Sequence, residues 1–182
     1  MLVKNIMSEP VIACTPWDTA QTAATLMKTH GIGAVPVVSD VLDPLLEGIV
    51  TDRDLCIAIV ASAGPADRIP VADVMTRVPI TCLPETSMVE CLELMRNCQV
   101  RRIPVVDQRG RCVGIVSQAD LARYASFEEI ALTLREVSSV PKPSVTPPVD
   151  EDYFYCGQLH ELDQIALLER RRQQAVAQEV LT

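Results

Sequence analysis

Residues 48–55, GIVTDRDL, return later in the chain as residues 114–121, GIVSQADL. Upstream segments also return in the same order: residues 3–8 (VKNIMS) as 71–76 (VADVMT), and residues 35–38 (VPVV) as 103–106 (IPVV). The displacement is 68 residues for these upstream segments and 66 for the GIV stretch. A duplication of this kind predicts two similar units packed about a pseudo-twofold axis, so that the clefts between them come in related pairs.

Composition narrows the class of protein. Of the 182 residues, 48% are hydrophobic but only 3% are aromatic, so aliphatic, Met and Cys side chains must fill the core. The net charge of −8 argues against a nucleic-acid partner. No apolar run approaches the roughly 20 residues that cross a bilayer, and the start lacks signal-peptide features, so we expect no membrane partner. Seven cysteines without a Cys-x-x-Cys pair predict reduced, buried thiols in a cytoplasmic protein.

Each repeat is expected to contain a strand, a helix, two strands and a second helix. Short apolar stretches predict the first strands, and apolar residues at i, i+3, i+4 and i+7 predict the helices that follow them. The expected strands are residues 11–13, 34–38 and 46–50 in the first repeat, and 80–82, 102–106 and 112–116 in the second. The second helices are expected to begin near Asp52 and Gln118. The predicted fold is α/β, with two βαββα repeats that are each too small to be stable alone.

Local signals predict where helices begin and end. Asp18 with Gln21, and Ser87 with Glu90, fit capping boxes at the first helix of each repeat. Gly31 is a natural end for the first of these helices, but Gln99 occupies that place in the second repeat. Residues 107–110, DQRG, predict a tight hairpin.

The predicted domains are residues 1–66 and 67–127 for the repeats, 128–148 for a linker and 149–182 for a tail. The Pro-rich run at residues 138–148 is typical of an extended linker. A partly periodic helix is expected at residues 161–180. Cys156 and His160 are four residues apart, which suits two metal ligands on one helical face, but a structural zinc site needs four ligands. The other interpretation of the tail is a docking arm or a disordered segment.

Taken together, residues 2–125 resemble a tandem pair of CBS domains, often called a Bateman module. Both copies carry the opening Val-x-x-Ile/Val-Met, the Val/Ile-Pro-Val-Val strand and the Gly-Ile-Val-Thr/Ser-x-x-Asp motif, in the same order and register. The resemblance implies the βαββα repeat fold and the binding of adenosine-containing ligands.

The last motif also suits a ligand site on physical grounds. A strand ends in a hydroxyl residue, Thr51 or Ser117, and an acid follows in the first helical turn, Asp54 or Asp120. Backbone N–H groups at a helix start favour an anion, and the hydroxyl can donate to a phosphate. The carboxylates are suitable acceptors for two ribose hydroxyls. The alternative is that Thr51 and Ser117 only cap their helices.

In similar modules a nucleotide lies between the first strand of one repeat and the hydroxyl-x-x-Asp motif of the other. The resemblance therefore implies two related sites. The first site would combine Cys14, Ile32, Gly33, Ser117, Ala119 and Asp120. The second would combine Thr51, Arg53, Asp54, Cys82, Val100 and, by its place in the second repeat, Arg101.

Basic residues are expected to make the two sites unequal. Arg101 and Arg102 precede the shared Pro in the second repeat, where the first repeat has Gly33 and Ala34. Arg101 is expected to face the phosphate at the Ser117 and Asp120 site, which would make that site the better one for an acidic nucleotide. Arg53 would compensate in part at the other site. The alternative is that Arg101 and Arg102 form a solvated surface pair.

The sequence predicts a non-catalytic protein. With two histidines, no Walker-type loop and no paired carboxylates at catalytic spacing, it lacks the usual nucleophilic and acid–base motifs. We expect a cytoplasmic regulatory homodimer, joined along helical faces, that binds AMP, ADP or ATP without an obligatory cofactor and controls an unknown partner protein. The alternatives are a stress- or redox-response protein acting through Cys112, Cys156 or the Cys156/His160 pair, and an interaction scaffold with empty clefts. S-adenosylmethionine and a nicotinamide dinucleotide remain open as ligands.

Overall fold

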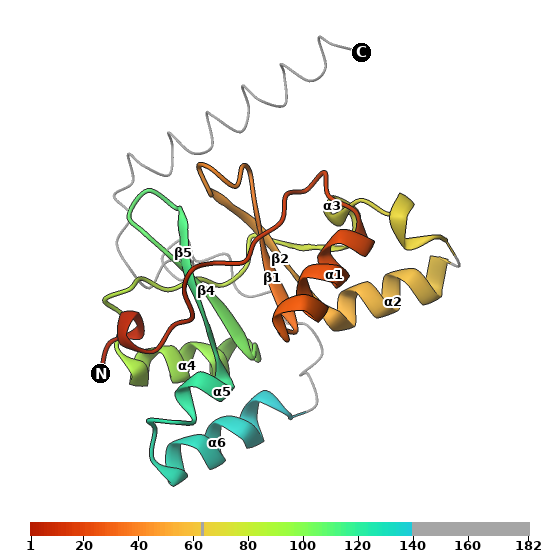
Figure 1. The fold of residues 1–182 in the computed structure, drawn as a ribbon. Helices are drawn as coiled ribbons and strands as arrows, with labels where there is room; N and C mark the ends of the chain where they lie inside the picture. Colours follow the sequence, from red (N-terminus) through yellow and green to blue (C-terminus); the bar gives the residue numbers. More distant parts are fainter. Residues whose placement is uncertain (63, 140–182) are drawn as a thin grey trace.

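Two antiparallel β-hairpins, one from each repeat, form the middle of the molecule (Figure 1). The structure is a computed structural model that describes residues 1–62 and 64–139. The hairpins consist of β1 (Ala34–Val38) with β2 (Leu46–Thr51), and β4 (Arg102–Val106) with β5 (Cys112–Ser117). In both, the register shifts at the end of the first strand, between Val37 and Val38 and between Val105 and Val106. The predicted hairpins are confirmed to within one residue, and they share even this irregularity.

Helices flank each hairpin in the predicted order. They are α1 (Ala20–His30) and α2 (Asp52–Ser62) in the first repeat, and α4 (Met88–Cys98) and α5 (Gln118–Leu121) in the second. The capping box of Ser87 and Glu90 is confirmed. The predicted cap at Asp18 is wrong, because Thr19 accepts the hydrogen bond from the Thr22 N–H. The Asp18 carboxylate instead accepts hydrogen bonds from the backbone and hydroxyl of Thr15.

The helices α1 and α4 end in the same backbone conformation despite different residues. Gly31 has φ 64° and Gln99 has φ 52°, both in the left-handed region. That region is strained for a residue with a side chain. The Gln99 amide donates hydrogen bonds to the Ser139 hydroxyl (2.8 Å) and the Glu136 carbonyl (3.4 Å), which help to hold it there.

The predicted strands at residues 11–13 and 80–82 are wrong in extent. The first repeat has one parallel bridge, Cys14 with Val37, one residue beyond the predicted strand, and the second has one at the last predicted residue, Cys82 with Val105. Continuing either ladder towards the N-terminus would need an N–H from Pro36 or Pro104, the third residue of β1 and of β4, and proline has none.

The opening segment of each repeat packs on the other repeat. The 3-10 helix η1 (Val3–Asn5) lies against the second repeat, where the Val3 N–H donates to the Thr86 carbonyl. The corresponding α3 (Val71–Val74), which follows η2 (Ala66–Arg68), lies against the first repeat, where the Val71 N–H donates to the Asp18 carbonyl. The strand β3 (Thr76–Arg77) then pairs antiparallel with β2. The two repeats therefore exchange equivalent segments.

This exchange completes both hydrophobic cores. Val3 and Ile6 are buried with Leu92, Met95 and Ile103 of the second repeat, and Val71 and Met75 with Met27, Val35 and Val50 of the first. Two shared glycines leave room for the crossing chain: a Cβ on Gly114 would lie 2.5 Å from Met7 Sδ, and one on Gly48 2.9 Å from Met75 Sδ. The predicted boundary at residue 66 divides the sequence repeats but does not divide the packed units.

The expected linker does not begin at residue 128, because residues Phe127–Val137 form the helix α6. Ser126 and Glu129 make a capping box, and Thr133 and Val137 are buried. The helix packs on α4, where Arg96 donates to the Thr133 hydroxyl (3.2 Å) and pairs with Glu136 (3.7 Å). The rest of the predicted linker, the predicted tail helix, Cys156 and His160 lie outside the described residues.

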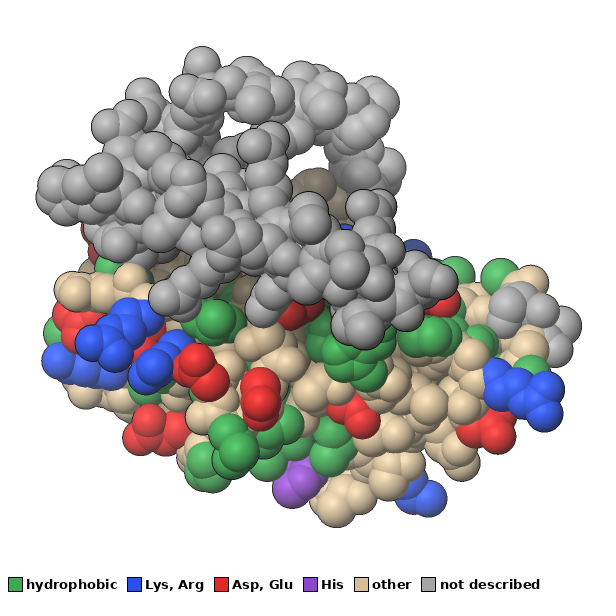
Figure 2. Space-filling view, turned by 90° about the horizontal axis from the view of Figure 1, so that it is seen from above, with side chains coloured by type: hydrophobic (Ala, Val, Ile, Leu, Met, Phe, Trp, Pro, Cys, Tyr) green, Lys and Arg blue, Asp and Glu red, His purple; other side chains and the backbone are tan. Residues whose placement is uncertain are grey.

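The described surface mixes charges of both signs. On the face shown in Figure 2, Asp and Glu side chains are scattered, whereas Lys and Arg side chains lie mainly towards the two ends. None of the helices in residues 1–62 and 64–139 is long and apolar enough to cross a membrane.

Candidate ligand site between the repeats

The two hydroxyl-x-x-Asp motifs have the same local geometry. Asp54 Oδ2 accepts hydrogen bonds from the Thr51 N–H (2.9 Å) and hydroxyl (2.7 Å), and the Asp54 N–H is 3.3 Å from Thr51 Oγ1. Asp120 Oδ2 accepts from the Ser117 N–H (3.0 Å) and hydroxyl (2.6 Å), and the Asp120 N–H is 3.2 Å from Ser117 Oγ. Both motifs are therefore helix caps, as the structural alternative predicted.

The capping hydrogen bonds leave the carboxylates of Asp54 and Asp120 able to accept further hydrogen bonds. Among residues 1–62 and 64–139, the hydrogen bonds found to each carboxylate end on Oδ2, which leaves Oδ1 to accept from a ligand hydroxyl. A half-buried carboxylate held in one rotamer is also a preorganised acceptor, because its orientation is fixed before a ligand arrives. The caps thus position the acids that the sequence analysis proposed as ligand contacts.

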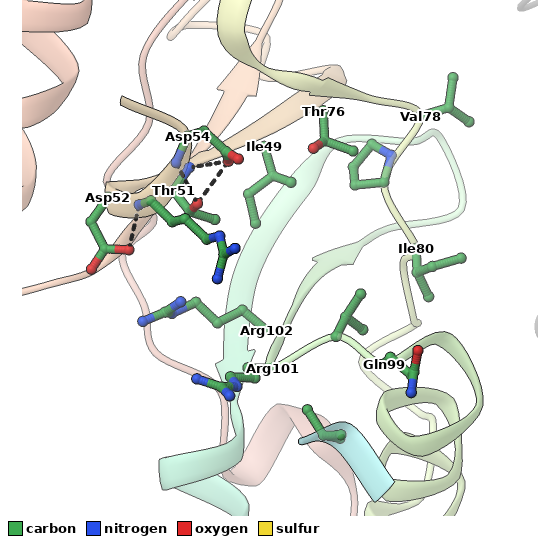
Figure 3. A pocket seen from close by; sticks show the side chains of 14 residues that line it. Ile49, Thr51, Asp52, Asp54, Thr76, Val78, Ile80, Gln99, Arg101 and Arg102 are labelled. Atoms are coloured by element: carbon green, nitrogen blue, oxygen red, sulfur yellow. Dashed lines mark hydrogen bonds between the residues drawn. The ribbon is translucent and has the colours of Figure 1, made fainter. Parts of the chain in front are cut away.

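A cavity of about 510 Å³ lies beside the motif of the first repeat, within the range of small-molecule sites (Figure 3). Its wall is built by both repeats. The first repeat supplies the end of β2 and the start of α2, and the second supplies the chain before and after α4 and the end of α6. The lining residues are Ile49, Thr51, Asp52, Arg53, Asp54, Thr76, Val78, Pro79, Ile80, Gln99, Val100, Arg101, Arg102 and Val137.

The cavity is basic in an acidic protein. Its charged lining is Arg53, Arg101 and Arg102 against Asp52 and Asp54, a formal charge of +1 in a chain of net charge −8. In Figure 3 the guanidinium groups of Arg101 and Arg102 lie on the same side of the cavity as Asp52 and Thr51. Apolar side chains such as Val78 and Ile80 line the other side. One half of the cavity therefore suits an anion and the other a flat apolar group.

The sequence analysis gave Arg101 two placements, and the structure agrees with only one of them. The Arg101 side chain lines the cavity of Thr51 and Asp54, so the expected phosphate contact at Ser117 and Asp120 is wrong. The backbone of Arg101 contacts the other motif, because the Arg101 carbonyl accepts a hydrogen bond from the Gln118 N–H (2.9 Å). That hydrogen bond joins the Arg101 peptide to the start of α5, while the Arg101 side chain extends into the cavity beside Thr51. The predicted difference in charge between the two sites is therefore reversed.

Arg102 reaches from the cavity to the first repeat. A Cβ built on Gly33 would lie 2.6 Å from Arg102 Nη2 and 2.9 Å from Asp52 Oδ2. The Arg102 guanidinium and the Asp52 carboxylate thus lie against Gly33, which has no Cβ to displace them. The Gly33 carbonyl also accepts a hydrogen bond from the Asp52 N–H (3.2 Å). Gly33 was predicted for the Ser117 site, but these contacts place it beside the start of α2.

The other predicted residues divide between the sites and the cores. Thr51, Arg53, Asp54 and Val100 line the cavity together, as predicted. Cys14 and Cys82 do not fit their predicted role, because each is at most 2% exposed and packs in the core of its repeat. Around the second motif, Ile32, Ser117 and Asp120 are half-buried and Ala119 is exposed. The Gln118 side-chain Nε2 there is buried and has no hydrogen-bond partner among the described residues.

The sequence analysis missed several lining residues. Gln99 and Val137 reach the cavity because the left-handed end of α4 and the last turn of α6 meet there. The signal for Val137 was the amphipathic pattern of residues 127–137, which was assigned to a linker. Val78 and Pro79, just ahead of the expected strand, and Ile80, its first residue, line the cavity because the chain crosses between the repeats at that point.

The buried thiols do not resemble reactive ones. Burial, with a smaller contribution from the Asp18 carboxylate, raises the pKa of Cys14 to about 12, and burial raises the pKa of Cys112 to about 11. A protonated thiol is a poor nucleophile, so this geometry gives no support to a redox role for Cys112. The described residues contain no group of three or more His, Cys, Asp or Glu side chains that could hold a metal ion.

A protein-family model for the CBS domain matches the chain twice, at residues 3–61 and 71–127. The chain belongs to the CBS-domain family. The pair of matches coincides with the two repeats, and α6 lies almost wholly beyond the second match. The resemblance noted in the sequence is thereby confirmed.

Several known proteins are similar to this CBS pair. The CBS domain-containing protein YhcV of Bacillus subtilis (strain 168) is 40% identical over 137 residues, which is 75% of this chain and 94% of YhcV. The crystal structure of Hypoxic Response Protein I with two coordinated zinc ions is 32% identical, with a TM-score of 0.62 over 69% of this chain and 100% of that chain. The CBS domain pair of protein MJ0100, solved with 5′-methylthioadenosine and S-adenosyl-L-methionine, is 30% identical, with a TM-score of 0.60 over 68% of this chain and 94% of that one.

Proposed function

We propose that this CBS pair is a non-catalytic sensor of a phosphate-bearing adenosine ligand, AMP, ADP or ATP, held in the Thr51/Asp54 cavity. The observation that carries the proposal is the grouping of Arg53, Arg101 and Arg102 with a preorganised carboxylate in one cavity between the repeats. The similarity to MJ0100, which was solved with two adenosine compounds, supports an adenosine-type ligand in general.

Each part of such a ligand has a complementary part of the wall. Asp54 Oδ1 would accept from the ribose hydroxyls, and the guanidinium groups of Arg101 and Arg102 would bind the phosphates. The adenine would lie against the apolar side formed by Val78, Ile80 and Val137. The groups that would make these contacts line one cavity (Figure 3).

The charge of the cavity favours nucleotides over other adenosine compounds. S-adenosylmethionine carries a sulfonium cation, which three guanidinium groups would disfavour, whereas each added phosphate gains attraction to them. A nicotinamide dinucleotide also carries phosphates, but it has a second nucleoside to accommodate. We therefore expect affinity in the order ATP above AMP above adenosine, with S-adenosylmethionine last.

Regulation would follow from the position of the cavity between the repeats. A ligand that contacts both repeats binds better to one relative arrangement of them and so shifts the population towards it. A homodimer of modules would pass that change to a partner protein that the sequence does not identify. The cavity adjoins Val137 of α6, the helix that leaves the pair, so α6 is well placed to carry it.

Isothermal titration calorimetry of the full chain with ATP, ADP, AMP, adenosine and S-adenosylmethionine tests the proposal. We expect the order of affinity given above and a weakening of ATP binding by about tenfold in Arg101→Gln. Arg109→Gln, an exposed arginine at the hairpin turn outside the cavity, is the matched control and should bind ATP as the wild type does. Failure of every adenosine compound to bind would favour the alternative of a scaffold with empty clefts.

A further inference from the structure

The arginines of the Thr51/Asp54 cavity are not neutralised by carboxylates. Among residues 1–62 and 64–139, no ion pair is found for Arg53, Arg101 or Arg102. Arg53 and Arg101 are exposed, so a group arriving from solution can reach them. The apolar side of the cavity is open as well, since Val78 is 58% exposed. An occupant should therefore carry both negative charge and a flat apolar part.

The described part of the chain ends at the edge of this cavity. Val137, in the last turn of α6, lines the cavity. Two residues later, the Ser139 hydroxyl accepts a hydrogen bond from the side-chain amide of Gln99, another lining residue (2.8 Å). Figure 3 shows Gln99 on the same side of the cavity as Ile80. The residues that follow Ser139 are therefore tethered beside the apolar side of the cavity.

The sequence that follows has both properties of the required occupant. Residues 150–152 are Asp-Glu-Asp and residues 153–155 are Tyr-Phe-Tyr, which puts three carboxylates next to three of the chain's five Tyr and Phe side chains. Carboxylates form strong, often bidentate hydrogen bonds with guanidinium groups, and aromatic rings pack on apolar walls and on guanidinium planes. Residues 150–155, the acidic–aromatic segment, thus combine an anion with flat rings, as a nucleotide does.

The connection is long enough for this segment to reach the cavity. Ten residues, 140–149, separate Ser139 from the segment. Fully extended at about 3.1 Å per residue they would span about 30 Å, several times the width of a cavity of this volume, so the chain can turn back into it. Tethering at this distance gives an effective concentration on the order of 1 mM. A similar segment of another protein would have to be present at that concentration to compete, which favours the chain's own segment.

We propose that the acidic–aromatic segment docks in the Thr51/Asp54 cavity and competes there with the nucleotide. The docking does not depend on a nucleotide, whereas the competition rests on the proposed function. A segment with a Kd of about 0.2 mM, at an effective concentration of about 1 mM, would fill the cavity about five-sixths of the time and weaken nucleotide binding about sixfold. The tail would thus raise the nucleotide concentration to which the protein responds.

Calorimetry of the full chain with ATP tests the competition. The neutralised variant Asp150→Asn/Glu151→Gln/Asp152→Asn should bind ATP about three- to sixfold more tightly than the wild type, because its segment leaves the cavity free for a larger fraction of the time. The aromatic residues remain in this variant, so part of the docking is retained. Its melting temperature is the check on folding.

The matched control removes three acids from another part of the same tail. Glu161→Gln/Asp163→Asn/Glu169→Gln changes the net charge equally and leaves the segment intact. It should bind ATP within about twofold of the wild type, since charges that do not contact the cavity are screened by salt. Equal gains in ATP affinity for the two triple variants would overturn the competition, because net charge alone would then explain them.

A labelled peptide of residues 149–155 tests the docking without a nucleotide. By fluorescence anisotropy it should bind the neutralised variant about three- to sixfold more tightly than the wild type, whose own segment occupies the cavity. Adding Arg101→Gln to the neutralised variant should weaken peptide binding about fivefold.

The outcomes separate this proposal from the proposed function. Equal peptide affinity in the wild type and the neutralised variant would overturn docking of the chain's own segment and leave a cavity that accepts acidic segments of other proteins. A peptide that binds neither, while ATP binds both, would overturn the docking and leave the nucleotide site. Peptide binding as expected, with no response to any adenosine compound, would support the docking and overturn the nucleotide as ligand.

Discussion

The two hydroxyl-x-x-Asp motifs differ in their surroundings but not in their own geometry. The hydroxyl donates to Oδ2 over 2.7 Å in the first repeat and 2.6 Å in the second. Between the hydroxyl and the acid, however, the first motif has Asp52 and Arg53 and the second has Gln118 and Ala119. The comparison teaches that the capping residues fix the backbone, whereas the residues between them and the facing repeat determine the charge of each site.

The facing repeat strengthens the contrast. The first motif faces Arg101 and Arg102, and their counterparts by sequence are Gly33 and Ala34. One duplicated backbone thus yields a cavity with three arginines beside Thr51, and the residues that correspond to these arginines in the other half of the sequence, Ala119, Gly33 and Ala34, are uncharged. Equal motifs therefore do not predict equal ligands.

The largest expected effect comes from removing the ribose acceptor. Asp54→Asn keeps the size of the side chain and an oxygen for the cap of α2 but loses the negative charge. We expect a loss of about 1.5–3 kcal/mol in ATP binding, or roughly 10- to 150-fold, as for other hydrogen bonds to charged groups. Asp120→Asn, the equivalent change at the other motif, should cost less than threefold at the high-affinity site. Calorimetry in which the two variants lose affinity equally would remove the contrast between the motifs.

The two motif glycines should differ in their effect on stability. A Cβ on Gly48 would lie 2.8 Å from the Thr76 carbonyl oxygen, which is backbone, whereas one on Gly114 first meets the flexible end of Met7. Gly48→Ala should therefore lower the free energy of unfolding by about 1–3 kcal/mol, and Gly114→Ala by less. Urea unfolding of the two variants measures the difference. A larger loss for Gly114→Ala would mean that Met7 is held as firmly as the backbone.

The substitution Gly33→Ala should move charged groups of the cavity without replacing an arginine. A Cβ there would meet only the ends of two flexible side chains, Arg102 Nη2 and Asp52 Oδ2, and would displace them. Gly33→Ala should lower ATP affinity about two- to fivefold, within the range of one weakened charged contact, and leave the melting temperature nearly unchanged. The affinity for adenosine should not change. An equal loss for ATP and adenosine would show that Gly33 shapes the cavity rather than positions Arg102.

The smallest effect concerns the buried thiols. The pKa of Cys14 is raised to about 12 and that of Cys112 to about 11, from 9.0 in an exposed thiol, because burial disfavours the thiolate. In the unfolded chain these thiols lose their protons near pH 9, while the folded chain keeps them, so the free energy of unfolding should fall as the pH rises from 9 to 11. At pH 8 iodoacetamide should modify the exposed Cys56 and spare Cys14 and Cys112. Rapid modification of Cys112 would instead support the redox alternative.

The hairpins and most helix boundaries could be predicted because their causes are local. Alternation, turn chemistry and capping pairs act over a few residues, which is why residues 34–38 and 102–106 match the structure fully and the Ser87 cap was found. Where two local options competed, as between Asp18 and Thr19, the sequence did not decide, because Asp18 found an alternative partner in Thr15.

The errors concern contacts between distant segments. The backbone at Arg101 is held by a hydrogen bond that the Gln118 N–H donates to the Arg101 carbonyl, a contact between segments 17 residues apart that local patterns do not predict. The burial of Cys14 and Cys82 depends on the crossing of the opening segments, which no periodicity records. The helix α6 was missed because its apolar residues were read as the start of a linker, although Ser126 and Glu129 fit the same capping pattern used elsewhere.

The exchanged opening segments make each repeat depend on its neighbour. A lone repeat of this design would lack Val3 and Ile6, or Val71 and Met75, from its core and would expose the side of its hairpin that they cover. It could complete its core only by exchanging that segment with a second molecule, at a rate that depends on protein concentration. In the tandem chain the exchange is intramolecular, so the effective concentration of the second repeat is fixed by the covalent connection.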